Sequence, residues 1–314
     1  MSLFRIPVEL LLEILTLALD EHLCPTDVLR VNHTISELGQ HILHSNLHFR
    51  SIGQLTVFAR ETTPLVCPPK SLVITLAGGS ASFDVFLHLA DALLRCKQSI
   101  DDEERKQDKP VPLDLLSLCL HSHTRNPHQK YIYDALTLAN PKTFIWTGPD
   151  PDHHFSTAVS PFYYFVAIVP AATFHLFCAI RTWTHIEHIT LANLSFPSDQ
   201  LGIHMPHDTP LLPVIPSLRT VCLGQATLLP PGAIAAMVCL PGQDSLERIR
   251  LVDAYRQSIW GPRLRRGDVE RAAIALGVGD PHTVVEKVRR LVVCEAKNER
   301  IMGGDRVEGL TILI

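Results

Sequence analysis

The segment from Ile6 to Asp20 carries more apolar surface than a single small core can bury. It reads as a helix, and Pro7 suits a first helical position because its missing N–H would be unpaired there anyway. With residues about 100° apart around the axis, Glu9, Glu13 and the other polar residues form one narrow stripe. The apolar residues cover the remaining arc of roughly 220°. A helix that packs only on its own domain needs an arc nearer 100°. The pattern therefore predicts either a fully internal helix or a helix shared with a partner.

The residues that follow favour the shared helix. Cys24-Pro25-Thr26-Asp27 breaks the chain, and Val28, Leu29 and Val31 resume a short apolar helix. A third helix is predicted by the helical spacing of Ile35, Leu38, Ile42 and Leu43. A unit of three short helices makes only a marginal core alone, so it gains stability if a partner covers its apolar face.

Three stretches of this unit resemble a known family. They are Ile6–Leu15, Cys24–Val31 and Asn46–Ser51, and they are similar to the F-box, in particular to F-boxes of fungal, basidiomycete-type proteins. The resemblance implies binding to the Skp adaptor of a cullin–RING ubiquitin ligase. The residues implied in that contact are Ile6, Pro7, Glu9, Leu10, Ile14, Leu29 and Val31.

Beyond the Cys67-Pro68-Pro69 break, strand-like and helix-like segments alternate. Strands are predicted at Ser71–Leu76, Leu115–Leu120 and Thr143–Trp146, and helices at Phe83–Cys96, Gln129–Ala139, Phe162–Arg181, Gly232–Val238 and Val269–Leu276. We therefore expect an α/β fold with two units, a helical unit at residues 1–60 and a second domain at residues 66–314.

One apolar pattern recurs in the second domain. Its copies are Leu115-x-x-Leu118-x-Leu120, Ile186-x-x-Ile189-x-Leu191, Leu218-x-x-Val221-x-Leu223, Leu246-x-x-Ile249-x-Leu251 and Val288-x-x-Leu291-x-Val293. This rhythm resembles a leucine-rich repeat array, and an ordinary β/α sandwich is the alternative. Stacked repeats share one core, so the array predicts a continuous sheet with Leu118, Ile189, Val221, Ile249 and Leu291 side by side.

Repeat stacking also predicts an open sheet face. Residues between the repeated apolar positions would point away from the helices and form a surface suited to a protein substrate. The residues expected on this face are His188, Thr190, Thr220, Cys222, Arg248 and Arg250.

Composition restricts the class of protein. The chain has 314 residues, of which 46% are hydrophobic and 19% charged, as in globular proteins. A net charge of −4 argues against a phosphate-binding surface, so no nucleic acid partner is expected. Eight cysteines without a Cys-x-x-Cys pair, and no signal peptide, favour free thiols in the cytoplasm or nucleus.

The stretch from Val159 to Ile180 has no Asp, Glu, Lys or Arg and is long enough to span a bilayer. Pro161 and Pro170 interrupt it, and His175 lies inside it. We therefore expect a buried helix of a protein without a membrane-spanning segment.

No arrangement of residues predicts bond chemistry. Cys119, His121 and His123 alternate along one strand, but a fourth metal ligand is missing from the pattern. His153-His154 lies beside Asp150 and Asp152 in a Pro-rich loop, which indicates a solvated loop. Gly78-Gly79-Ser80 lacks the remaining residues of a nucleotide-binding loop. No catalytic residue, cofactor or metal is expected.

These patterns together predict a substrate adaptor of a Skp–cullin–F-box ubiquitin ligase, acting in ubiquitin-dependent degradation. It would join the Skp adaptor to an unknown protein substrate and perform no chemistry itself. Two alternatives stay open: a repeat-type binding scaffold without ligase coupling, and an α/β enzyme that uses the Gly78-Gly79-Ser80 turn.

Overall fold

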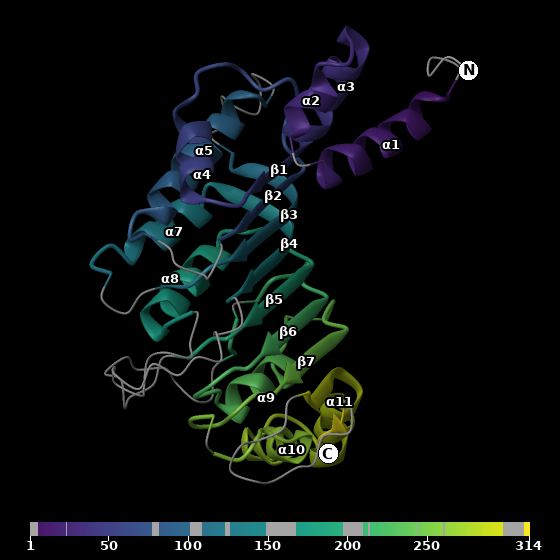
Figure 1. The fold of residues 1–314 in the computed structure, drawn as a ribbon. Helices are drawn as coiled ribbons and strands as arrows, with labels where there is room; N and C mark the ends of the chain where they lie inside the picture. Colours follow the sequence, from purple (N-terminus) through teal and green to yellow (C-terminus); the bar gives the residue numbers. More distant parts are fainter. Residues whose placement is uncertain are drawn as a thin grey trace.

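The structure is a computed structural model of a mixed α/β chain (Figure 1). It describes residues 6–22, 24–76, 82–100, 109–122, 126–148, 168–196, 210–212, 214–242, 244–259, 261–297 and 311–314. Within these ranges the chain forms ten α-helices and one sheet of nine strands.

Strands that follow one another in the sequence are neighbours in the sheet, because the strand order is the sequence order from β1 to β9. The strands are β1 (Asn46–Phe49), β2 (Ser71–Thr75), β3 (Val111–Cys119), β4 (Ala139–Thr147), β5 (His188–Ala192), β6 (Thr220–Gly224), β7 (Arg248–Val252), β8 (Val292–Ala296) and β9 (Thr311–Ile312). Neighbours from β1 to β8 are parallel, and β9 is antiparallel to β8. Each unit thus contacts chiefly the units before and after it, as in a solenoid.

Helices cover one face of the sheet, and its opposite face is drawn without a helix across its middle strands (Figure 1). The covering helices are α4 (Ile52–Arg60), α5 (Val85–Gln98), α7 (Lys130–Leu136), α8 (Pro170–Ile180), α9 (Pro231–Cys239), α10 (Arg266–Ala275) and α11 (Pro281–Leu291). Burial alternates along the strands: Leu72 and Ile74 of β2 are fully buried, whereas Ser71 and Val73 are half-exposed. The apolar residues of this alternation form one core between sheet and helices.

The repeated pattern stacks as predicted in the middle of the sheet. Ile189, Val221 and Ile249 are direct neighbours in β5, β6 and β7. The prediction for Leu118 is wrong, because β4 lies between β3 and β5 and Ile189 pairs with Phe144, which pairs with Leu116. Strand β3 is apolar at nearly every position, so the pattern fits it in two registers.

The prediction for Leu291 is also wrong. It is the last residue of α11, and β8 begins at the next residue, Val292, which pairs with Ile249. Val284, Val288 and Leu291 are buried at helical spacing on α11. Apolar residues three or four apart mark one face of a helix, and the repeat pattern also begins with two apolar residues three apart. The pattern therefore predicts a strand at Leu291, where the structure has the end of a helix.

The apolar segment ending at Ile180 forms a shorter helix than predicted. Helix α8 begins at Pro170, and Ile168 makes a parallel bridge with Leu194 instead of helical contacts. Residues 159–167 lie outside the described ranges. Five residues of α8 are buried, and no described helix is long and apolar enough to cross a membrane.

The first three helices form a small separate cluster, here called the three-helix unit. They are α1 (Val8–Glu21), α2 (Pro25–Leu29) and α3 (His33–Ser45). Their buried cluster consists of Leu11, Leu15 and Ile35, with Val28, Leu38 and Ile42 packed against it. Residues 46–60, which the predicted boundary groups with this unit, form β1 and α4, and their Leu47, Phe49 and Leu55 belong to the larger core.

Candidate protein-binding surfaces

Helix α1 has two apolar stripes on different sides. Leu11, Leu15 and Leu19 are buried. Leu10, Ile14 and Leu17, which follow one another at helical spacing, are 51%, 47% and 58% exposed. The fully internal helix is therefore excluded, because the surplus apolar surface that the sequence predicts faces solvent in the isolated chain. We call Leu10, Ile14 and Leu17 the α1 stripe.

The other predicted docking residues divide into two groups. Pro7, Glu9 and Val31 are exposed, and Val31 is 64% exposed. Ile6 and Leu29 are only half-exposed. Leu29 turns toward α3, since a Cβ added at Gly39 would overlap with Leu29 Cδ2. The structure thus places Leu29 chiefly in the packing between α2 and α3.

The six residues predicted on the open sheet face do lie there in two rows. His188, Thr220 and Arg248 are neighbours in β5, β6 and β7, and Thr190, Cys222 and Arg250 form the next row. Each alternates with fully buried residues of its strand. The alternation fixes their direction, because successive strand residues point to opposite faces.

The middle of the open face is a strip without any Asp, Glu, Lys or Arg. Its members, here called the uncharged strip, are Ser71, Val73, Thr75, Leu115, Ser117, Cys119, Thr143, Ile145, Thr147, His188, Thr190, Ala192, Thr220, Cys222 and Gly224. All except Thr75 are half-buried. Most are short, and a Cβ added at Gly224 would lie 3.3 Å from Ala192 Cβ. The strip is therefore a shallow surface of hydroxyl and apolar groups.

Charged residues of alternating sign border this strip at the N-terminal ends of the strands. Ser71, Leu115, Thr143, His188, Thr220 and Arg248 form one row across β2 to β7, and each is directly preceded by a charged residue. We call these charged residues the charge ladder. They are Lys70, Asp114, Lys142, Glu187, Arg219 and Glu247. Because they hold equivalent positions at the beginning of six adjacent strands or just before it, each neighbours a residue of opposite sign.

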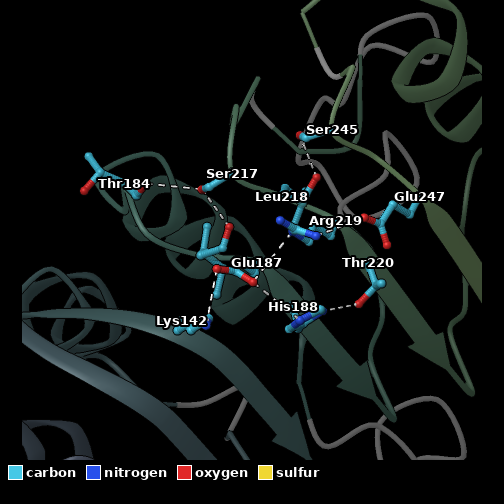
Figure 2. A network of polar contacts seen from close by, with 11 residues as sticks. Lys142, Thr184, Glu187, His188, Ser217, Leu218, Arg219, Thr220, Ser245 and Glu247 are labelled. Atoms are coloured by element: carbon cyan, nitrogen blue, oxygen red, sulfur yellow. Dashed lines mark hydrogen bonds and ion pairs between the residues drawn. The ribbon is translucent and has the colours of Figure 1, made fainter.

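Four members of the charge ladder form a chain of ion pairs (Figure 2). Glu187 lies 3.5 Å from Lys142 Nζ and 3.7 Å from Arg219 Nε, and Arg219 Nη1 lies 3.2 Å from Glu247. His188 of the uncharged strip has its Nε2 3.8 Å from Glu187, so the ladder adjoins the strip directly. Sequence reasoning missed the ladder, although its residues stand at one fixed place relative to the repeated leucines.

Polar bonds hold adjacent repeats in register beside the ladder. The Ser217 hydroxyl donates to the Ile186 carbonyl at 2.8 Å, and Ser245 donates in the same way to Leu218 at 2.9 Å. His188 Nδ1 and Thr220 Oγ1 are 2.8 Å apart across two strands (Figure 2). These contacts fix the spacing of the ladder, because each ties one strand end to the next.

The part of the open face formed by the last strands of the chain, β7 and β8, has less positive charge than Arg248 and Arg250 alone suggest. Glu295 of β8 is 3% exposed and accepts a 2.6 Å hydrogen bond from Arg250 Nε. This bond raises the pKa of Arg250, and Arg248 lies 3.8 Å from the same carboxylate. Burial raises the pKa of the nearby Cys222 thiol, which argues against a reactive cysteine.

A cavity of about 680 Å³ lies at the edge of the sheet that carries the charge ladder, near the three-helix unit. His41 of α3, the Cys67–Lys70 segment and the ladder residues Asp114, Lys142 and Glu187 contribute to its lining. It therefore joins the three-helix unit to the charged border of the open face.

Most of the residues considered above for bond chemistry lie outside the described part of the chain. His123, Gly78-Gly79-Ser80 and His153-His154 lie outside the described residues. Cys119 is a half-buried member of the uncharged strip, and no group of three or more His, Cys, Asp or Glu in the described ranges is placed to hold a metal ion.

No protein-family model matches the chain, and no curated protein or solved structure matches it.

Proposed function

We propose that the chain is a substrate adaptor of a Skp–cullin–F-box ubiquitin ligase. In this proposal the F-box-like three-helix unit docks on a Skp adaptor through the α1 stripe, and the leucine-rich-repeat-like sheet holds a protein substrate on its open face. Function is positional, because the complex raises the local concentration of substrate lysines near the ubiquitin-conjugating enzyme.

One observation carries the docking half of the proposal. The α1 stripe exposes three large aliphatic side chains at helical spacing, while the opposite stripe supports a separate small cluster. Burying a fully exposed side chain of this size stabilises by about 1.5–3 kcal/mol, and because each of these is already about half-buried, covering one gains roughly half of that. A small unit that exposes this surface gains stability from a partner with an apolar groove.

A pull-down with purified Skp adaptor tests the proposal. The double variant Leu10→Asp/Ile14→Asp places two carboxylates in the expected interface, where an unpaired charge costs several kcal/mol. Each 1.4 kcal/mol is about tenfold in affinity, so recovery of the adaptor should fall below detection. Leu87→Asp/Leu94→Asp is the matched control, because these leucines are 39% and 46% exposed on α5, away from the three-helix unit.

The outcome separates the proposal from its main alternative. Adaptor capture by the wild type and the α5 control, but not by the α1 double variant, supports ligase coupling. If the wild type captures no adaptor, or the α1 double variant captures as much as the wild type, the ligase function is wrong. The repeat-type scaffold then becomes the better description. Circular dichroism of all three proteins confirms that each is folded.

A further inference from the structure

We propose that the open face binds its protein partner as an amphipathic α-helix lying across the strands, with charges of alternating sign along the edge that meets the charge ladder. This inference rests on the proposed role of the open face in substrate binding. It specifies the partner segment by its shape, its apolar face and its charge order.

The dimensions of the uncharged strip fit one helix. The strip is three rows wide, from Thr143 to Thr147 in β4, which corresponds to about 13 Å at 3.3 Å per strand residue. A helix with its side chains is about 10–12 Å in diameter. From β2 to β6 the strip extends about 19 Å at 4.8 Å per strand, the length of about 13 helical residues. The charge ladder beside it continues to β7 and extends about 24 Å, the length of about 16 helical residues.

The composition of the strip suits an apolar helix face. A buried charge needs a partner, and the strip offers none to a ligand because it has no charged side chain. Its short side chains, including Thr190, Ala192 and Gly224, leave room for larger aliphatic residues of a ligand.

The charge ladder gives the second criterion. Its sign changes at every strand, about every 4.8 Å. Residues three or four apart on one edge of a helix are separated by about 5 Å along the axis. A helix across the strands thus presents about one edge residue to each ladder position, and alternating acidic and basic residues meet opposite charges throughout.

The ladder has charge available for a partner. Neither Lys70 nor Asp114, at the end near the cavity, makes an ion pair within the described residues. Further along, the Arg219–Glu247 pair is solvent-exposed on both sides, at 54% and 60%, and Lys142 is 53% exposed, whereas the Glu187 carboxylate that pairs with Lys142 and Arg219 is 28% exposed. Exposed pairs of this kind contribute only about 0–1 kcal/mol, so they can share their charges with a ligand at little cost.

Two synthetic peptides of identical composition test the inference. Both have about 16 residues, a leucine stripe and a hydrocarbon staple on the solvent face, which makes their helicity equal. One alternates Glu and Lys along the ladder edge, and the other has its Glu residues in one half and its Lys residues in the other. The block order mismatches an alternating ladder in every register. Fluorescence anisotropy without any Skp adaptor should show about tenfold tighter binding of the alternating peptide, and less preference at high salt.

Protein variants complete the test. Glu187→Lys creates three consecutive cations across β4, β5 and β6, so it should remove the preference for the alternating peptide. Glu286→Lys, an exposed reversal on α11, is the matched control and should leave that preference unchanged. Thr190→Lys puts a charge into the strip and should weaken both peptides. Equal affinity for the two peptides, or no binding of either, overturns the inference.

The two proposals fail separately. Leu10→Asp/Ile14→Asp should bind the alternating peptide like the wild type even where it has lost the Skp adaptor, because α1 does not contribute to the uncharged strip.

Discussion

Truncation in the two stripes of α1 should have effects of very different size on stability, although Ile14 and Leu15 are adjacent in sequence. Leu15 is 4% exposed and lies in the small cluster with Leu11 and Ile35, whereas Ile14 is 47% exposed. Leu15→Ala and Ile14→Ala each shorten one aliphatic side chain in the same helix turn. Their helix propensities change similarly, so a difference in stability reports burial.

The expected magnitudes follow from the size of the cluster. Substituting alanine for a leucine that is buried in a large core costs about 2–5 kcal/mol. Only three residues of the small cluster are buried and the site can collapse, so we expect Leu15→Ala to cost about 2 kcal/mol. Ile14→Ala should stay within about 0.5 kcal/mol of the wild type.

Hydrogen exchange followed by mass spectrometry measures this difference locally. A loss of about 2 kcal/mol corresponds to about thirtyfold faster exchange of the amides of α1 when local opening limits exchange. Strands β3 to β7 should be unaffected, because their core is a separate cluster. Equal effects of the two variants, or faster exchange throughout the sheet in Leu15→Ala, would refute the division into two cores.

Three further predictions test other parts of the molecule. Glu295→Gln should lower the free energy of unfolding by about 1–2 kcal/mol in urea denaturation, because it weakens a charged hydrogen bond to Arg250. The control Glu247→Gln removes an exposed charge and should change the free energy of unfolding by less than about 0.5 kcal/mol. Burial, and then the charges of Arg95 and His41, lower the pKa of His44 in the folded protein. The unfolded chain therefore binds more protons than the folded protein below about pH 6.5, and stability should fall as the pH drops through that value. His44→Asn should flatten that part of a pH–stability curve. Burial raises the pKa of Cys96 and Cys294 to about 12, so iodoacetamide at pH 8 should modify the exposed Cys24 and spare both buried thiols until the protein unfolds.

The sequence predicted best where one pattern admitted one interpretation. In β5, β6 and β7 a single apolar register fits, and the residues expected on the open face lie there. The apolar surplus on α1 was predicted from composition around the helix, and the exposed Leu10 and Ile14 confirm it. In both cases burial follows from residue spacing alone.

Prediction failed where the same residues satisfy two patterns. Strand β3 has Leu113, Leu115, Leu116 and Leu118, and only hydrogen bonding to β4 decides that Leu116 takes the place aligned with Phe144. Strand β1 was included in a helical motif, although its exposed–buried alternation is that of a strand. The partner of Arg250 is Glu295 of another strand, and no local pattern reveals that pair. The charges that pair with Glu187 do have a sequence signal, because they stand at the same place beside each repeat.

The connection between the two candidate surfaces bears on the proposed function. Helix α3 ends at Ser45 and β1 begins at Asn46, so no linker separates the three-helix unit from the sheet. Two further contacts fix α3: the Val66 N–H donates to His44 Nδ1 at 3.0 Å, and Cys67 Sγ lies 3.5 Å from the His41 carbonyl. A flexible linker would spread a bound substrate over many positions, whereas a continuous backbone with side contacts holds it at one distance from the α1 stripe. For a protein that acts by placing one partner near another, this coupling is as important as the affinity of either surface.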